Sequence, residues 1–433
     1  MTARDGPPRF GTDGLRGVAN SELTPEVALA LGRAAARHLD GGPFLVGRDT
    51  RRSGPMLQSA LSAGLASEGR DVVDVGVIPT PGLAFLAASK GQPAAMISAS
   101  HNPYEDNGIK LFGPGGAKLS VAVETAVHDE LDRLFHAEAG QRSGGEAGSA
   151  GEICLEPGRL SSYEDRLASI GLPIGDWRSR RRGGDHSEIV LDCANGAASS
   201  VVPRLLGRLR IPHRTIFASP DGTNINAGCG STHPEAVMAE VVERGAALGL
   251  AFDGDADRVL AVDHEGKLVD GDQLIAMFAA DLHVRGLLRG DQVVVTVMSN
   301  LGLRRALEAL RIGVVETPVG DRHVADAMEE GGLVLGGEQS GHLIFSEYAT
   351  TGDGIMTALL LLELLSRRQC SLAELAASSM TRLPQVLHNV SVAEPGLLAG
   401  APAVWEAVGA AEAELGPDGR ILLRASGTES CVR

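Results

Sequence analysis

Short apolar runs alternate with helical patterns along most of this 433-residue chain, and this alternation limits the folds that it can adopt. Residues 44–46, 72–75 and 94–97 are apolar runs of strand length. Helical patterns begin near Pro25, which follows a capping threonine, and near Pro55. A strand–helix–strand order favours parallel strands joined by crossover helices. The same order returns after residue 189 and again after residue 293, so we expect several related α/β units.

The length and composition fit an ordinary multidomain protein. A chain of 433 residues holds about three domains as a first expectation. Hydrophobic residues make up 43% and charged residues 22%, so each domain can bury a core. The net charge of -16 argues against nucleic-acid binding as the main role. A local basic pocket for an anionic small molecule remains compatible with it.

The cysteines and the apolar segments predict a cytoplasmic protein. The five cysteines are scattered without a C-x-x-C pair, which indicates a reducing compartment and no metal or disulfide framework. The first nine residues contain no apolar signal-peptide core. The richest apolar run, residues 359–365, is short and contains Glu363, which favours a buried helix over a membrane span.

A polar turn rich in Asn, Pro and Gly follows the apolar run 94–97, over residues 98–110. Ligands of open α/β sheets bind at the ends of strands, where a hydroxyl such as that of Ser100 is suited to be modified or to attack. An ordinary Ser/Asn turn would explain the Asn and Gly residues. It would not explain why His101 and Lys110 accompany the serine.

Three aspartates alternate in the loop that follows a second apolar strand. Asp253, Asp255 and Asp257 come directly after residues 248–252, and Arg258 follows them. Carboxylates this close repel one another unless a cation neutralises them, and an all-oxygen site selects Mg²⁺ or Ca²⁺. The alternative is a solvated acidic turn. An EF-hand is excluded because a strand follows Arg258 directly.

Two further loops carry polar groups. The Gly-rich run 10–17 presents Arg16, either as a cation for phosphate or as a solvated arginine on a surface turn. Glu338 and Ser340 follow an apolar strand and suit vicinal sugar hydroxyls, while His342 could transfer a proton or be structural.

The C-terminal residues combine cations with small polar side chains. Arg424 and Arg433 flank a Ser-Gly-Thr turn, which is either a phosphate site or a frayed terminus. Residues 138–152 predict a linker. Residues 178–185 predict a solvated basic loop, with phosphate attraction as the alternative.

The order of these loops resembles the α-D-phosphohexomutase superfamily from Phe10 to Arg433. The marks of its amino-sugar branch lie in residues 10–17, 98–110, 224–235 and 337–342. The resemblance implies three related α/β domains with mainly parallel mixed sheets and a smaller C-terminal α+β domain around a central cleft. The expected domains are 1–160, 161–264, 265–375 and a shortened 376–433.

The resemblance also implies a role for each loop. Ser100 would be the phosphoserine and, with Asp253, Asp255 and Asp257, would hold Mg²⁺. Lys110, His342 and Arg16 match catalytic positions. The positions that match substrate-binding residues are His101, Arg258, Glu338, Ser340, Arg424, Ser426, Gly427, Thr428 and Arg433.

The activity implied is transfer of a phosphoryl group between C1 and C6 of a hexosamine phosphate through a bisphosphate, upstream of UDP-N-acetylglucosamine and peptidoglycan. A hexose or hexosamine 1,6-bisphosphate would be the activator. The expected partner is a small sugar phosphate, with no nucleic acid and no membrane, and a homodimer is left open. Mutases of glucose and mannose phosphates, and a metal-dependent binding protein without turnover, are the alternatives. Ser430 departs from the superfamily, which usually has proline there.

Overall fold

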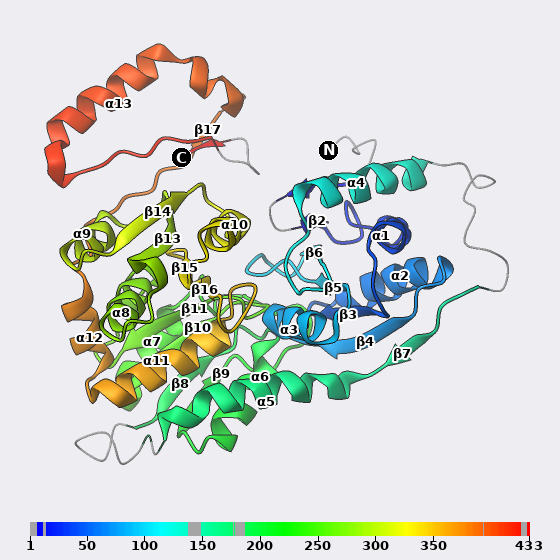
Figure 1. Cartoon of the computed structure of the whole chain (residues 1–433), viewed down its shortest axis with the longest axis horizontal. Helices are drawn as coiled ribbons and strands as arrows, with labels where there is room; N and C mark the ends of the chain where they lie inside the picture. Colours follow the sequence, from blue (N-terminus) through cyan, green and yellow to red (C-terminus); the bar gives the residue numbers. More distant parts are fainter. Residues whose placement is uncertain are drawn as a thin grey trace.

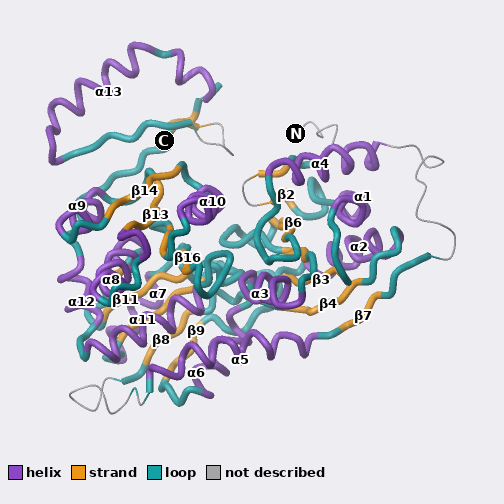
Figure 2. Tube along the Cα trace, viewed as in Figure 1, coloured by secondary structure: helices purple, strands orange, loops and turns teal. Residues whose placement is uncertain are grey.

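The computed structural model describes residues 7–11, 14–136, 149–175, 177, 187–392, 394–425 and 431–433. These residues form three sheets of seven, five and four strands and a small sheet of two. Helices enclose the three larger sheets (Figures 1 and 2). The predicted basic loop 178–185, most of the predicted linker 138–152, and Ser426, Gly427 and Thr428 lie outside the described residues.

The first sheet has the order β1-β2-β6-β5-β3-β4-β7. Strands β5, β3, β4 and β7 are parallel, whereas β6, β2 and β1 pair in antiparallel fashion. The strands are β1 (Phe10–Gly11), β2 (Gly14–Val18), β3 (Phe44–Arg48), β4 (Val72–Val77), β5 (Ala94–Ile97), β6 (Asp106–Phe112) and β7 (Ile153–Leu155). The helices are α1 (Pro25–His38), α2 (Gly54–Ser67), α3 (Thr80–Lys90), α4 (Val121–His136) and α5 (Leu160–Gly171).

The second sheet has the order β12-β11-β10-β8-β9, with β8, β9 and β10 parallel and β11 and β12 antiparallel. Its strands are β8 (Ile189–Asp192), β9 (His213–Ile216), β10 (Leu248–Phe252), β11 (Val259–Asp263) and β12 (Leu268–Val269). Its helices are α6 (Ala198–Arg208) and α7 (Glu235–Arg244).

The third sheet has the order β14-β13-β15-β16, and only β16 is antiparallel to its neighbour. Its strands are β13 (Gln292–Thr296), β14 (Gly313–Thr317), β15 (Leu335–Gly337) and β16 (Leu343–Phe345). The helices are α8 (Gly271–Val284), α9 (Leu301–Ala309), α10 (Asp321–Gly331), α11 (Gly354–Arg368) and α12 (Leu372–Ser379).

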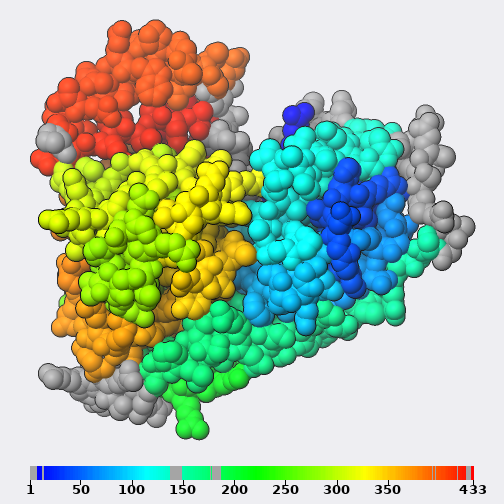
Figure 3. All heavy atoms as spheres, viewed as in Figure 1, coloured from blue at the N-terminus to red at the C-terminus, as the bar shows by residue number. Residues whose placement is uncertain are grey.

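The C-terminal residues form a small unit of β17 (Val390–Ser391), β18 (Cys431–Val432) and α13 (Pro402–Leu415). None of the α13 residues is buried. Figure 3 shows this unit stacked on the third α/β unit and set apart from the first. By contrast, one continuous apolar core runs from the first sheet through α5 and the second sheet to α11.

The three larger sheets repeat one local arrangement that positions the site. In each, a buried strand ends in a polar loop and the chain returns as an antiparallel strand: β5 to β6, β10 to β11 and β15 to β16. The polar loops begin at Ser98, Asp253 and Glu338 respectively. This return strand is the reason that the sheets are mixed, as predicted.

Most predicted strands and helices are confirmed, and two predicted loops are wrong in part. The Gly-rich run 10–17 contains β1 and most of β2, and the polar run 98–110 contains most of β6. These segments pair with each other and β6 also pairs with β5, so tertiary pairing overrides their turn-like composition. Residues 359–365 lie in the buried helix α11, as predicted.

No helix of the described residues is long and apolar enough to span a lipid bilayer. The five cysteines lie among the described residues, and no disulfide joins them.

Candidate active site

Ser100 lies in the loop between β5 and β6 and is almost completely buried. Its backbone has a φ of 52°, in the left-handed region that residues with a Cβ rarely adopt. The Ser98 hydroxyl accepts a hydrogen bond from the Ser100 backbone N–H at 2.9 Å. The Ser100 hydroxyl in turn donates to Asp253 Oδ2 at 2.6 Å. The serine predicted from the strand end therefore contacts the predicted acidic loop of the next domain.

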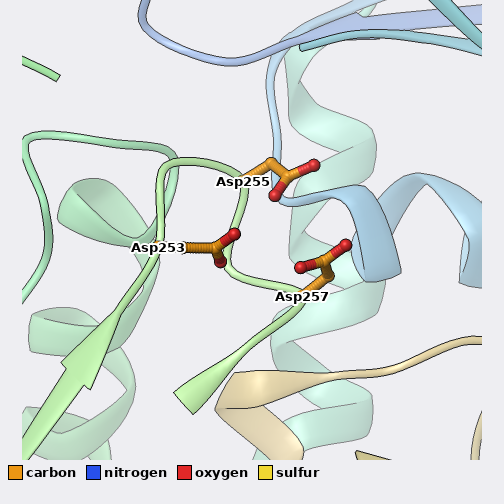
Figure 4. Close-up of side chains that lie close together, drawn as sticks. All are labelled: Asp253, Asp255 and Asp257. Atoms are coloured by element: carbon orange, nitrogen blue, oxygen red, sulfur yellow. The ribbon is translucent and has the colours of Figure 1, made fainter. Parts of the chain in front are cut away.

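The three aspartates lie in the tight connection between β10 and β11 (Figure 4). All are buried, and one carboxylate oxygen of each lies within 4.8 Å of the others. Among the described residues, Asp255 Oδ1 and Asp257 Oδ1 have no hydrogen-bond partner. Buried carboxylate oxygens left without donors fit a hard divalent cation, so the residues present suit the predicted metal.

Lys110, on β6, is a predicted catalytic residue that the structure brings into this cluster. Its Nζ lies 2.9 Å from Asp255 Oδ2 and 3.6 Å from Asp257 Oδ2. Burial and the two neighbouring carboxylates raise the pKa of Asp253 well above its usual value. The pKa of Asp257 lies below its usual range. Burial acts to raise it, but the positive groups of Lys110, His342 and Arg258 have the larger, opposite effect.

The N-terminus of α3 supports the acidic loop from the first domain. Thr80 Oγ1 donates to Asp255 Oδ2 at 2.6 Å, and the Thr80 backbone N–H donates to the Asp255 carbonyl at 2.9 Å. The first turn of a helix favours negative charge because its N–H groups point outward. Asp255 is thus oriented by an element that lies 175 residues away in the sequence.

The loop between β15 and β16 carries the predicted sugar-binding groups. Glu338 Oε1 accepts from the Gly320 backbone N–H at 3.1 Å. Ser340 Oγ is buried and, among the described residues, has no hydrogen-bond partner. Glu338 and Ser340 therefore keep polar atoms for a ligand, since each carboxylate or hydroxyl can make several hydrogen bonds.

His342 follows this loop and is fully buried beside the acidic cluster. The Gly352 N–H donates to Nε2 at 3.1 Å, which places the proton of the neutral ring on Nδ1. Nδ1 lies 3.7 Å from Asp257 Oδ2. Burial lowers the pKa of His342, but the adjacent Asp257 carboxylate outweighs it, and the net pKa is raised.

Three more predicted residues lie around the serine and the aspartates. His101 Nδ1 is 3.3 Å from Ser100 Oγ. The Arg258 backbone N–H donates to Asp253 Oδ1 at 3.3 Å. Arg16, on β2, lies opposite Gly108 of β6 and reaches Asn102 Oδ1 at 3.5 Å.

Arg424 and Arg433 lie in a different place from this cluster. Their backbones exchange two hydrogen bonds of 2.8 Å. Both side chains line a cavity of about 180 Å³ together with Asn300, Gln385 and Arg420, between the third α/β unit and the C-terminal unit. Three arginines, Arg420, Arg424 and Arg433, and one carboxylate, Asp418, line this cavity. Burial and the neighbouring Arg433 lower the pKa of Arg424.

Four residues that contact the site were not assigned a role from the sequence: Asp49, Arg51, Thr80 and Asn226. The polar run that follows β3 and the Asn-rich loop after β9 were visible in the sequence as strand-end loops. The sequence does not show how the domains pack: docking of the first domain on the second brings Thr80 to Asp255 and Asn226 to Ser100. Folding of the first domain itself brings Arg51 to Ser100.

Models of all four domains of one family match the chain. They are described as phosphoglucomutase/phosphomannomutase α/β/α domains I (residues 7–137), II (163–266) and III (270–383) and the C-terminal domain (387–433). The chain therefore belongs to the phosphoglucomutase/phosphomannomutase family, whose members share this fold and this order of domains.

One curated relative and two solved structures are similar to the chain over nearly its whole length. A phosphoglucosamine mutase of Desulforamulus reducens is 51% identical over 98% of this chain and 94% of that protein. The crystal structure of a phosphoglucomutase/phosphomannomutase family protein from Burkholderia thailandensis matches with a TM-score of 0.77 and 27% identity, covering 98% of this chain and 91% of that one. The structure of Aspergillus fumigatus N-acetylphosphoglucosamine mutase in complex with GlcNAc-6P and magnesium shares the fold, with a TM-score of 0.68, 19% identity and coverage of 100% and 92%.

Proposed function

We propose that this chain is a phosphoglucosamine mutase, which interconverts glucosamine 6-phosphate and glucosamine 1-phosphate. The observation that carries the proposal is the 2.6 Å contact of the buried Ser100 hydroxyl with an aspartate of the three-carboxylate loop. A phosphorylatable hydroxyl beside a divalent-metal site is the arrangement that phosphoryl transfer requires. The amino-sugar substrate is supported by the name of a relative that is 51% identical over nearly the whole chain.

In the proposed reaction, Ser100 carries a phosphoryl group that moves to the free C1 or C6 hydroxyl of the sugar. The bond from phosphorus to Ser100 Oγ breaks, a bond to the sugar oxygen forms, and Lys110 or His342 takes the hydroxyl proton. The resulting 1,6-bisphosphate reorients in the site, so that its other end faces Ser100. Its other phosphoryl group returns to Ser100, and the sugar oxygen that it leaves regains a proton. Arg16 and His101 stand beside the serine loop and supply positive charge or hydrogen bonds to the phosphoryl group.

The acidic loop would hold Mg²⁺ through Asp253, Asp255 and Asp257 together with an oxygen of phosphorylated Ser100. When bound, the ion supplies charge neutralisation at the phosphoryl group. Arg258 adds fixed positive charge beside the same carboxylates, and Lys110 adds positive charge whenever it holds a proton. Buried Lys110 also keeps the loop from carrying an uncompensated triple negative charge.

Substrate binding is assigned to two loops. Glu338 and Ser340 would accept and donate hydrogen bonds at the sugar hydroxyls. This role is supported by Ser340 Oγ, which has no hydrogen-bond partner in the part of the chain that the structure describes. Arg424 and Arg433, with Ser426, Gly427 and Thr428, would bind the phosphate that does not react. A 1,6-bisphosphate activator, a homodimer, a cytoplasmic location and the domain boundaries at 160, 264 and 375 stay predictions.

A substrate panel tests the proposal. The purified protein is assayed with glucosamine, glucose and mannose 6-phosphates in Mg²⁺ and a trace of glucose 1,6-bisphosphate, and Ser100→Ala is run in parallel. We expect the highest kcat/KM for glucosamine 6-phosphate, no turnover by the variant, and a phosphate on Ser100 in the mass spectrum of the wild-type chain.

Two other outcomes would change the assignment. A preference for glucose or mannose phosphate would place the chain with the other activities named by the family models. Binding of sugar phosphates without turnover and without phosphate on Ser100 would instead indicate a metal-dependent binding protein.

A further inference from the structure

The backbone of the serine loop is held by donors from two domains. Arg51, in the polar run after β3, directs Nη2 at the carbonyl oxygens of Ser100 and Asn102, at 2.9 and 2.8 Å. Asn226, in the second domain, directs Nδ2 at the same two oxygens, at 2.8 and 3.0 Å. Each carbonyl therefore accepts one hydrogen bond from each domain, which occupies both of its lone pairs.

Arg51 is also held in place by contacts other than those with the Ser100 and Asn102 carbonyls. Its side chain is fully buried and its Nε pairs with the buried carboxylate of Asp49 at 2.9 Å. Its Nη1 donates to the carbonyls of Pro103 and Asp106, the second at 3.1 Å. Asp49 Oδ2 also accepts from the Ser98 hydroxyl at 2.7 Å. A planar guanidinium can serve several carbonyls at once, which a lysine ammonium cannot do in the same geometry.

The loop requires such support because Ser100 has a φ of 52°. A residue with a Cβ persists in this region only when its surroundings over-determine it. The same carbonyl of Ser100 lies so close to Gly254 that a Cβ on Gly254 would approach it to 2.6 Å. The serine loop and the metal loop are thus in backbone contact, and the hydrogen bonds of Arg51 and Asn226 surround that contact.

We propose that Arg51 and Asn226 are positioning residues that hold the Ser100 and Asn102 carbonyls from both sides and so aim the Ser100 hydroxyl at the acidic loop. We call these two residues the carbonyl clamp. The proposal rests on the proposed function in one respect, since it assigns the clamp to the reaction of Ser100. Among the described residues, the Ser100 hydroxyl contacts His101 and Asp253, whereas Arg51 and Asn226 bind the Ser100 carbonyl, so each acts through the loop backbone.

The test uses Asn226→Gly in the full chain. Asn226 has a φ of 57°, which glycine adopts without strain, so this variant removes the amide and adds no backbone penalty. Asn20→Gly is the matched control, because Asn20 has a φ of 62° in an exposed turn. Arg51→Lys keeps the charge beside Asp49 but loses the fork, and Arg52→Gln changes the exposed neighbouring arginine as its control.

We expect kcat of Asn226→Gly and Arg51→Lys to fall by about 10- to 100-fold with KM changed by less than about twofold, since a misplaced nucleophile affects chemistry more than binding. Hydrogen exchange of peptides that cover residues 98–108 is expected to accelerate in both variants. Both controls are expected to match the wild type in kcat and in exchange.

Two results would overturn the clamp: wild-type kcat and exchange in Asn226→Gly, or a fall in kcat with unchanged exchange over residues 98–108. Thermal unfolding of each variant identifies global destabilisation. If Arg51→Lys does not fold, the milder variant Asn226→Gly still tests the clamp. If the wild type fails to turn over any sugar phosphate, the proposed function fails, but the exchange experiment still decides whether the clamp holds the loop.

Discussion

At the scale of single residues, Thr80 provides the most direct test of how the first domain prepares the proposed metal site of the second. Its hydroxyl donates to Asp255 Oδ2 at 2.6 Å. Hydrogen bonds to a metal-ligating carboxylate commonly contribute about 10- to 100-fold in metal affinity. Thr80→Val keeps the shape but removes this donor. We expect the Kd for Mg²⁺, measured by isothermal titration calorimetry, to rise by about tenfold or more.

Thr50→Val is the matched control for this measurement. The Thr50 hydroxyl also crosses from the first domain to the second, donating to the Asn195 carbonyl at 2.6 Å, but it touches no carboxylate of the acidic loop. Its Mg²⁺ affinity should equal that of the wild type. An equal loss of Mg²⁺ affinity in both variants would show that domain docking, and not the orientation of Asp255, controls this affinity.

Gly254 tests the close approach between the serine loop and the acidic loop. A Cβ at this position would lie 2.6 Å from the Ser100 carbonyl oxygen, 2.8 Å from Ile225 Cδ1 and 2.9 Å from Asn226 Nδ2. Gly254→Ala must therefore push the two loops apart, and a displacement of about 1 Å in a reacting group can cost about 100-fold in rate. We expect kcat to fall to about that extent.

The control for this prediction is Gly409→Ala in α13, where an added Cβ meets nothing within 4 Å. Its activity should be unchanged. Wild-type turnover by Gly254→Ala would mean that the loops separate without loss and that their contact has no role in the reaction.

At the scale of secondary structure, α5 and α11 meet through a buried hydrogen bond. Asp353 caps α11 by accepting from the Met356 N–H at 2.9 Å, and it accepts from the Tyr163 hydroxyl of α5 at 2.8 Å. Tyr163→Phe leaves this buried carboxylate without one donor. We expect the free energy of unfolding in urea at pH 7.5 to fall by about 1–3 kcal/mol.

The pH dependence of this loss identifies its cause. Burial raises the pKa of Asp353 to about 6, so the side chain is neutral at pH 5 and loses less when the Tyr163 donor is removed. The deficit of Tyr163→Phe should therefore shrink between pH 7.5 and pH 5. A deficit that stays constant would indicate lost packing alone.

Tyr348→Phe, at an exposed position, is the control for this variant and is expected to change the free energy of unfolding by less than about 0.5 kcal/mol.

The sequence predicts elements best where the side-chain pattern alone decides them. Strand β10 and helix α11 are apolar enough to be recognised without any knowledge of their partners. Strand β6 is not, because its Asn and Gly residues are typical of turns. Gly108 is needed there because a Cβ would lie 2.7 Å from the Ser98 carbonyl. That reason becomes visible only once β6 has paired with both of its neighbours.

The same limit separates the site residues that could be predicted from those that could not. Ser100, Asp253 and Glu338 each follow a buried strand, so their positions come from a local pattern. Arg51 and Asn226 are recognised only from their contacts in the folded chain. Arg51 donates to four carbonyls of its own domain, and Asn226 donates to two of the same carbonyls from the second domain. No local sequence pattern marks either residue for this role.

At the scale of the whole molecule, buried carboxyl groups decide how stability depends on pH. Burial raises the pKa of Asp192, Asp272 and Asp353 from an ordinary value near 3.8 to about 6. A group with a raised pKa binds its proton more tightly in the folded state. Its contribution therefore stabilises the protein below about pH 4 and is lost progressively as the pH rises through about 6.

The opposing groups act at lower pH. Arg133 and Arg37 hold the pKa of Glu130 at about 2, although burial opposes them. The stability that this pair contributes is present above the ordinary pKa of 4.5 and is lost as the pH falls toward 2. Between pH 5 and pH 7.5, the stability therefore depends on the buried carboxyl groups and on His342. The raised pKa of His342 also makes the folded protein less stable as the pH rises.

We therefore expect the Tm of the metal-free protein in EDTA to rise by several degrees when the pH is lowered from 7.5 to 5.5. Asp272→Asn gives the matched test, because its amide oxygen can still accept the hydrogen bond that the Asn300 N–H donates at 2.7 Å. This variant should have a higher Tm than the wild type at pH 7.5 and a smaller rise on acidification, since one group that must lose its proton has been removed. Differential scanning calorimetry at four pH values in this window measures both quantities. A Tm that falls steadily from pH 7.5 to 5.5 would mean that these carboxyl groups are ionised at no cost in the folded chain, and that paired surface charges, rather than buried acids, control its stability.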